Sequence, residues 1–229
     1  MKPEKALKIL NEIVVNCFRC PRLVHHRETY PPKPIYADEP YWRRPVPGYG
    51  DPDAWLMIIG LAPAPHGGNR TGRPFTGDLS AVFLMRCLYN RGFASQPTSE
   101  YYDDGLKLLG CYMTAAVKCV PPQHKPLYQE FLNCSPYLFE EFAILKKVTC
   151  VLALGRLAFD AYLLYVKAQG IKHPKYHFKH GEKYEFEGMP TLFASYHPSP
   201  RNTNTGTMTA EMFEGLLSKI KHSCCPTIN

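Results

Sequence analysis

Two sets of side chains in this sequence have the types and spacing that chemistry requires. One is an aspartate and a histidine that each follow a predicted strand, and the other is a group of paired cysteines. Asp78 closes the 19-residue stretch 60–78, which holds five glycines, three prolines and two arginines. Glycines let backbone N–H groups approach an anion, and the N-terminus of a following helix favours negative charge. This stretch is therefore a candidate ligand-binding loop, with an ordinary long connection as the alternative.

Nine cysteines, an odd number, favour a metal site over a disulfide framework in a chain expected to be intracellular. Cys17 and Cys20 stand three positions apart at the end of a predicted helix. Cys119 follows a predicted strand, and Cys134 lies in the next predicted helix. Four thiolates in two pairs make a site for either zinc or an iron–sulfur cluster, and the residue types barely separate the two. The other cysteines are predicted to be structural or incidental: Cys87, Cys111, Cys150, Cys224 and Cys225.

The elements that must position these residues alternate between buried strands and helices. Apolar runs predict strands at residues 55–59, 111–117, 149–154 and 191–194, with an edge strand at 183–186. Helical periodicity predicts helices at residues 5–15, 79–88, 127–142, 157–168 and 209–221. The pattern predicts an α/β domain with a parallel sheet. Ligands bind at the carboxyl ends of such strands, where the 60–78 loop and the stretch 195–202, which contains His197, both begin.

Residues 31–52 hold seven prolines among tyrosines, arginines and a tryptophan, so no regular element is expected there. The segment is either a clamp that wraps the body and reaches a polyanion or a passive connector. The net charge of +7 favours an anionic partner, with nucleic acid as the leading candidate. No signal peptide and no long apolar run is seen, so a cytoplasmic protein without a membrane partner is expected, with a flexible tail at residues 223–229.

Three motifs resemble the uracil-DNA glycosylase superfamily, and its family 5, the B-type enzymes of thermophilic archaea and bacteria, is the close match. They are GLAPAPHGGNRTGRPFTGD at 60–78, YMTAAVKCVPP at 112–122 and HPSPRN at 197–202. The resemblance implies a single α/β domain over residues 1–229, with a four-stranded parallel sheet flanked by helices and an iron–sulfur-bearing extension within residues 17–52. It also implies a structural [4Fe–4S] cluster on Cys17, Cys20, Cys119 and Cys134, and no nucleotide cofactor.

The activity that the resemblance implies is excision of uracil and other deaminated bases from DNA, as a step of base-excision repair. We expect a monomer, with a sliding clamp as a further partner to consider. Bond cleavage leaves positive charge on the sugar and negative charge on the base, so the site must stabilise both. His197 is the expected donor to the base oxygen, Asp78 orients water, and Phe75 stacks on the flipped base. Their plainer roles are a loop histidine, a helix cap and a packing residue.

The remaining implied site residues fall into two groups. Those expected around the base are Gly60, Ala62, Ala64, Ala115 and Asn202. Those expected on DNA are Arg70, Arg73, Ser199 and Arg201, with Arg201 inserted into the duplex.

Two departures from the better-known branches predict relaxed base discrimination. Those branches carry an acidic residue two places into the first motif, where this chain reads Leu61-Ala62-Pro63, and an asparagine where Ala115 stands. A site without a side chain that makes two hydrogen bonds to the base leaves no polar group unpaired when another base enters. Hypoxanthine is therefore an expected substrate. The competing hypotheses are a non-catalytic, cluster-stabilised module that binds nucleic acid, and a redox protein.

Overall fold

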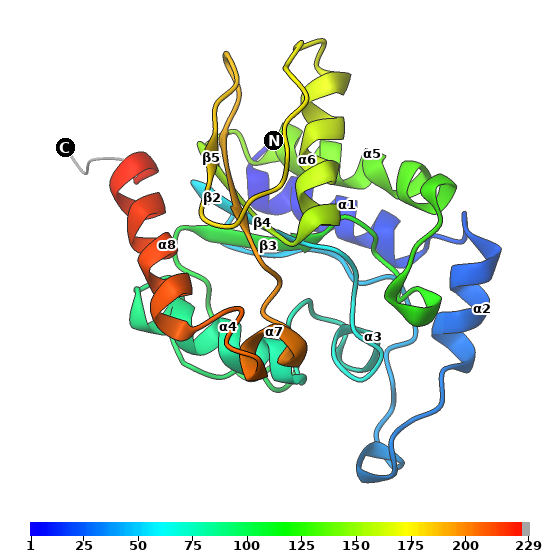
Figure 1. The fold of residues 1–229 in the computed structure, drawn as a ribbon. Coiled ribbons are helices and arrows are strands. Elements are labelled where there is room, and N and C mark those ends of the chain that lie inside the picture. The colour runs from blue at the N-terminus through cyan, green and yellow to red at the C-terminus, as the bar shows by residue number, and fades with distance from the viewer. Residues whose placement is uncertain (226–229) are drawn as a thin grey trace.

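A six-stranded sheet forms the centre of the computed structural model, which describes residues 1–225 (Figure 1). The strands are β1 (Tyr49–Gly50), β2 (Leu56–Gly60), β3 (Cys111–Ala115), β4 (Cys150–Leu154), β5 (Lys183–Tyr184) and β6 (Thr191–Ser195). Their order across the sheet is β1-β3-β2-β4-β6-β5. The four central strands run parallel. They are apolar and almost wholly buried, as strands covered on both faces must be.

The sheet is mixed rather than purely parallel, which corrects the predicted four-stranded parallel sheet. The four predicted buried strands are confirmed, but β1 and β5 add antiparallel edges. β5 falls within the predicted edge strand. β1 lies in the proline-rich segment, where the prediction of no regular element is wrong. Tyr49 follows the closely spaced Pro45 and Pro47 and is free to pair with Met113. A 3₁₀ turn at Pro34–Tyr36 is a second short regular element there.

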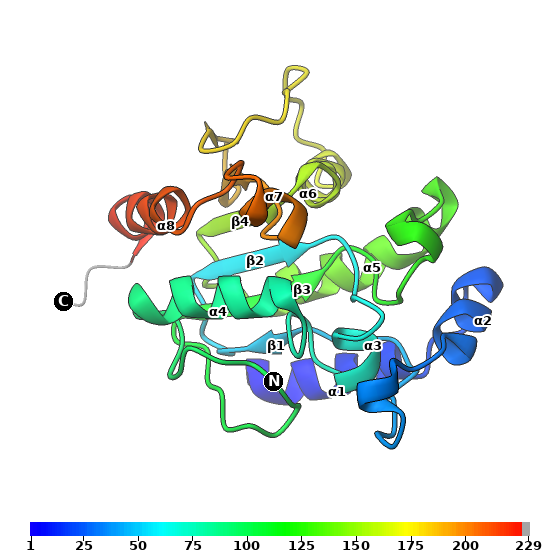
Figure 2. The ribbon, with the colours of Figure 1, turned by 60° about the horizontal axis from the view of Figure 1, so that its bottom comes forward.

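Helices cover both faces of the sheet (Figures 1 and 2). They are α1 (Pro3–Val15), α2 (Pro21–Thr29), α3 (Gly68–Thr71), α4 (Leu79–Asn90), α5 (Tyr128–Ile144), α6 (Arg156–Ala168), α7 (Pro200–Asn204) and α8 (Ala210–Cys224), with a 3₁₀ turn at Pro122–His124. α4 and α8 pack on one face through residues such as Leu84 and Phe213. α1, α5 and α6 pack on the other face through Leu7, Leu138 and Phe159.

The five predicted helices are confirmed, and α2, α3 and α7 are additional. α2 and α7 are short and polar, so they lack the apolar stripe by which a helix is predicted. Both begin with a proline at the first turn. α8 continues to Cys224, so residues 223 and 224 are helical and the predicted tail does not start there. The rest of that prediction reaches residues 226–229, which lie outside the described residues.

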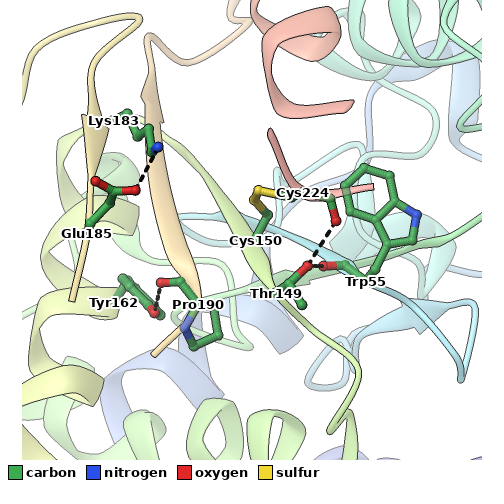
Figure 3. The surroundings of a disulfide bond; sticks show 8 residues. All are labelled: Trp55, Thr149, Cys150, Tyr162, Lys183, Glu185, Pro190 and Cys224. Atoms are coloured by element: carbon green, nitrogen blue, oxygen red, sulfur yellow. Dashed lines mark hydrogen bonds and ion pairs between the residues drawn. A yellow bond between two sulfur atoms is a disulfide. The ribbon is translucent and has the colours of Figure 1, made fainter. Parts of the chain in front are cut away.

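A disulfide joins Cys150, the first residue of β4, to Cys224, the last residue of α8 (Figure 3). Of the two predicted alternatives, structural or incidental, the structural one holds for this pair, because the fold brings the end of α8 back to the start of β4, 74 residues away in sequence. The neighbouring Thr149 hydroxyl donates a hydrogen bond of 3.2 Å to the carbonyl oxygen of Cys224. The last helix is thus fixed to the sheet at its final turn.

No helix within residues 1–225 combines the length and the apolar character that crossing a membrane requires.

Candidate active site and cysteine-lined cavity

A cavity of about 380 Å³ lies at the carboxyl ends of β2, β3 and β6. The connections that follow these strands supply most of its wall, as expected for an open α/β sheet. The lining residues are Leu61, Ala62, Pro63, Ala64, Pro74, Phe75, Asp78, Ser80, Ala115, Pro121, His124, His197, Ser199 and Pro200. The two motifs predicted to converge, 60–78 and 197–202, therefore meet at one site.

His197 follows β6 and presents a neutral ring to this cavity. Burial, with a smaller contribution from the nearby charge of His124, lowers the pKa of His197 to about 4. The side-chain amide of Asn202 donates a hydrogen bond of 2.8 Å to the carbonyl oxygen of His197, which fixes the backbone at this position. A neutral imidazole can donate one N–H to a ligand without carrying a buried charge.

Asp78 both caps α4 and lines the cavity. Its carboxylate accepts a hydrogen bond of 3.0 Å from the N–H of Ala81, as an N-cap residue does. A Cβ atom at Gly67 would lie 2.1 Å from the Asp78 carboxylate, so only glycine allows the loop to pass this close. Burial raises the pKa of Asp78, while backbone N–H groups of the helix and the charge of Arg70 oppose that shift.

Phe75 stands over the end of β2 in a backbone conformation that side chains rarely adopt, with φ at +48°. A Cβ atom at Gly60 would lie 2.7 Å from the Phe75 ring, so the missing side chain of Gly60 lets the ring lie on the strand end. The ring centroid is 5.9 Å from that of His197. Gly60 therefore supports the predicted platform from behind and does not line the cavity.

The other predicted base-site residues divide into two groups. Ala62, Ala64, Ala115 and Ser199 line the cavity. Among the described residues, the N–H groups of Ala62 and Ala64 donate to no other group, which leaves them available to a ligand. Asn202 contacts His197 instead of the cavity, and Arg201 is exposed on α7.

Arg70 and Arg73, predicted to contact DNA, are held within the loop by ion pairs. Their side chains are only 4% and 5% exposed and form ion pairs with Glu39 and Asp104. Arg73 also donates to the hydroxyl of Ser99 at 3.0 Å. Sequence alone suggested free cations because the acidic partners come from distant segments.

His124 is the cavity residue that sequence reasoning missed. It lies in the turn after Cys119, and both Gln123 and His124 have positive φ, at +53° and +57°. Two consecutive side chains in this region are costly and mark a constrained turn. The signal in the sequence was a histidine two residues after the Pro121-Pro122 pair.

A second, narrow cavity of about 20 Å³ is lined by all four predicted ligand cysteines. Cys17 and Cys20 come from the turn between α1 and α2, Cys119 from the connection after β3, and Cys134 from α5. The N–H of Lys118 donates to the sulfur of Cys134 at 3.2 Å, and Asn133 donates to that of Cys20 at 3.6 Å. Donors aimed at sulfur favour its anionic form.

Arg27 places a buried positive charge against one of the four sulfurs. Its side chain is 1% exposed, and its guanidinium donates to the sulfur of Cys119 at 3.2 Å. The Nε atom of Arg27 is buried without a hydrogen-bond partner. Within residues 1–225, no three Cys, His, Asp or Glu side chains are grouped closely enough to hold a single metal ion. The four thiols share a cavity without forming a compact site for one ion.

Comparison with known proteins gives a consistent relationship over most of the chain. Residues 47–221 match the profile of the Uracil DNA glycosylase superfamily. The type-5 uracil-DNA glycosylase of Thermus thermophilus is 47% identical over 206 residues, covering 90% of this chain and 92% of that protein. Its counterpart from Pyrobaculum aerophilum is 46% identical, with 90% and 88% covered. That of Mycobacterium tuberculosis is 40% identical, with 93% and 80% covered.

Proposed function

The chain belongs to the uracil-DNA glycosylase superfamily, and we propose that it hydrolyses the N-glycosidic bond of uracil in DNA after the base has left the helix. The observation that carries this proposal is the convergence of His197, Asp78 and Phe75 on one cavity. A cavity of about 380 Å³ falls within the range of small-ligand sites. The abasic product is the substrate of the later steps of base-excision repair.

Each side chain has a defined task in this mechanism. The Phe75 ring provides a face on which the extruded base stacks. The neutral ring of His197 donates a hydrogen bond to a carbonyl oxygen of the base, where negative charge develops as the bond breaks. The free N–H groups of Ala62 and Ala64 add to this stabilisation. Asp78 orients the attacking water and offsets the positive charge on the sugar.

The apolar side chain of Ala115 in the cavity wall supports a broader substrate range that includes hypoxanthine. Ala115 lines the cavity and has no group that could read a donor–acceptor pattern. Replacing it by asparagine supplies such a reader. We expect Ala115→Asn to lower excision of hypoxanthine relative to uracil, measured as the ratio of kcat/KM on matched oligonucleotides. An unchanged ratio would mean that this wall does not set base choice.

We also propose that Cys17, Cys20, Cys119 and Cys134 hold a [4Fe–4S] cluster. Four thiols and no histidine line the cavity. Its one carboxylate, Glu130, is held in an ion pair with Arg22 at 2.6 Å, so the thiols are the groups left for iron–sulfur ligation. A four-iron cluster is larger than one ion, so its ligands stand further apart than those of zinc. The buried, partly unpartnered Arg27 would then face the negative charge of the ligated sulfurs. When bound, the cluster supplies a cross-link between segments far apart in sequence.

The test of the activity is excision from a uracil-containing oligonucleotide, followed by alkaline cleavage at the abasic site. We expect strand breaks only where uracil stood, and a loss of roughly a hundredfold or more in His197→Ala. DNA affinity of that variant should stay near the wild-type value. A protein that binds the oligonucleotide without producing alkali-labile sites would instead be a binding module.

A further inference from the structure

A groove of about 610 Å³ adjoins the base cavity on the other side of Asp78. We call it the basic groove and define it by Lys33, His66, Asp78, Leu79, Arg86 and Tyr101. Asp78 is a wall residue of both hollows. A nucleotide that enters the base cavity remains joined to its neighbours through phosphates, so the strand on one side must cross the rim near Asp78.

The groove presents two exposed cations, Lys33 and Arg86. Among the described residues, neither forms an ion pair. The charge of Arg70, which also lines the groove, is already balanced by Glu39. Burial lowers the pKa of His66, and the charges of Lys33 and Arg70 lower it further. Glu100 and Asp78 are the acidic residues of the wall.

The groove also offers surfaces on which bases can stack. The Tyr101 side chain is 53% exposed, and no other ring of the described chain stacks on it. Leu79 and Val82, on the first turn of α4, are 69% and 54% exposed. Cations beside exposed aromatic and apolar side chains are the combination that binds single-stranded nucleic acid.

Lys33 is held in place although its segment is irregular. The chain that leaves α2 lies beside α3 (Figure 2), where the N–H of Trp42 donates to the carbonyl oxygen of Arg70 at 2.9 Å. The N–H of Lys33 donates to the Tyr41 hydroxyl at 3.3 Å, and that hydroxyl shares a hydrogen bond of 2.9 Å with His66. The proline-rich segment therefore wraps the 60–78 loop and fixes the position of one groove cation.

We propose that the basic groove binds the part of the damaged strand that adjoins the extruded nucleotide, with phosphates on Lys33 and Arg86 and a base on Tyr101. This inference rests on the proposed glycosylase function. It adds a binding site for the flanking nucleotides, which the base cavity does not provide. It also gives the proline-rich segment a role in holding DNA.

The first test is the salt dependence of KM on a single-stranded uracil oligonucleotide. We expect the double variant Lys33→Ala/Arg86→Ala to raise KM about tenfold and to reduce the log-log salt slope by about 1.4, at roughly 0.7 for each phosphate contact. Tyr101→Ala should raise KM about tenfold at every salt concentration. The matched controls are Lys8→Ala/Lys167→Ala, which removes two exposed cations elsewhere, and Tyr89→Ala at the far end of α4.

The second test uses two series of oligonucleotides, shortened stepwise on the 5′ or the 3′ side of uracil. In one series, wild type and Lys33→Ala/Arg86→Ala should converge once the nucleotides that fill the groove are gone. A double variant whose log-log salt slope equals that of wild type overturns the inference. A defect of the double variant that is seen only in duplex DNA also overturns it, because it would place the complementary strand in the groove. Wild type that does not excise uracil would refute the proposed function instead, so the two failures are distinct.

Discussion

The rings of Phe75 and His197 lie with their centroids 5.9 Å apart and their planes inclined by 31°. A base stacked between the two rings would need about 7 Å, twice the roughly 3.4 Å spacing of stacked bases. In the proposed mechanism, the base would therefore stack on Phe75 from the open side of the cavity, with His197 at its edge. This arrangement suits a hydrogen bond to a carbonyl oxygen better than a stacking contact.

Substitutions of Asp78 separate its two roles. Asparagine caps a helix as well as aspartate does, so Asp78→Asn should keep the melting temperature of wild type. It removes the negative charge, so we expect single-turnover excision to fall by at least a hundredfold. Asp78→Ala should also lose about 1 kcal/mol of unfolding free energy. Wild-type excision by Asp78→Asn would leave Asp78 as a helix cap alone.

Gly60→Ala tests the support behind Phe75. The added Cβ atom would lie 2.7 Å from the ring, so the ring must move off the strand end. We expect excision to fall at least tenfold while DNA affinity changes less. Gly215→Ala in α8 is the matched control, because nothing lies within 4 Å of its added Cβ atom and alanine favours a helix. Equal activities of the two variants would exclude a role for the Phe75 position.

The pH dependence of excision should follow Asp78 and not His197. With its pKa lowered to about 4, His197 is neutral at pH 5 and above, so no step in the single-turnover rate is expected near 6.5. Burial raises the pKa of Asp78, so the rate should fall as the pH is lowered and the carboxylate takes up a proton. A step near 6.5 that disappears in His197→Asn contradicts this assignment.

The same histidine makes stability depend on pH in a defined direction. Between about pH 4 and 6.5, unfolded chains bind a proton at His197 that the folded protein does not bind. The unfolding free energy should therefore decrease as the pH falls through this window. Denaturant titrations of wild type and His197→Asn at several pH values measure this effect. The loss of unfolding free energy that wild type shows and His197→Asn lacks should shrink towards pH 7.

Cys17→Ala tests the cluster. We expect it to lower iron and sulfide content and the melting temperature, while the surviving protein keeps the base preference of wild type. Cys87→Ala is the control, because Cys87 is buried in the core between the sheet and α4 and does not line the cysteine cavity. Full iron content in Cys17→Ala would refute the ligand assignment, and a shifted base preference would place the cluster in recognition.

The disulfide should contribute to stability through the unfolded chain. A cross-link between residues 74 positions apart is worth about 4 kcal/mol in the chain-entropy description. Cys224→Ser, or reduction of wild type, should lower the melting temperature, and reductant should then have no further effect on the variant. A variant as stable as oxidised wild type would show that the bond does not form in solution.

Much of the fold follows from apolar periodicity. The four central strands and five helices were predictable, because each buries a continuous apolar run or stripe. The edge strand Tyr49–Gly50 was not, since two residues carry no periodicity and their pairing with β3 depends on the finished sheet. α2 was missed for a similar reason: its sequence is polar and its position depends on the cysteine cavity.

A site residue was predictable where its own motif also contains the backbone segment that positions it. Asp78, Phe75 and His197 follow strand ends whose positions the sequence fixes locally. The ion pairs of Arg70 and Arg73 were not predictable, because only the folded chain reveals their partners Glu39 and Asp104.

The bond between Cys150 and Cys224 means that one polypeptide must keep sulfur in two oxidation states. The four cavity thiols can hold the proposed cluster only while reduced, whereas the disulfide on α8 strengthens the protein only while oxidised. Strong reductant during purification would thus favour metal retention and weaken the last helix, and handling in air would do the reverse. Conditions that preserve the whole molecule lie between these extremes.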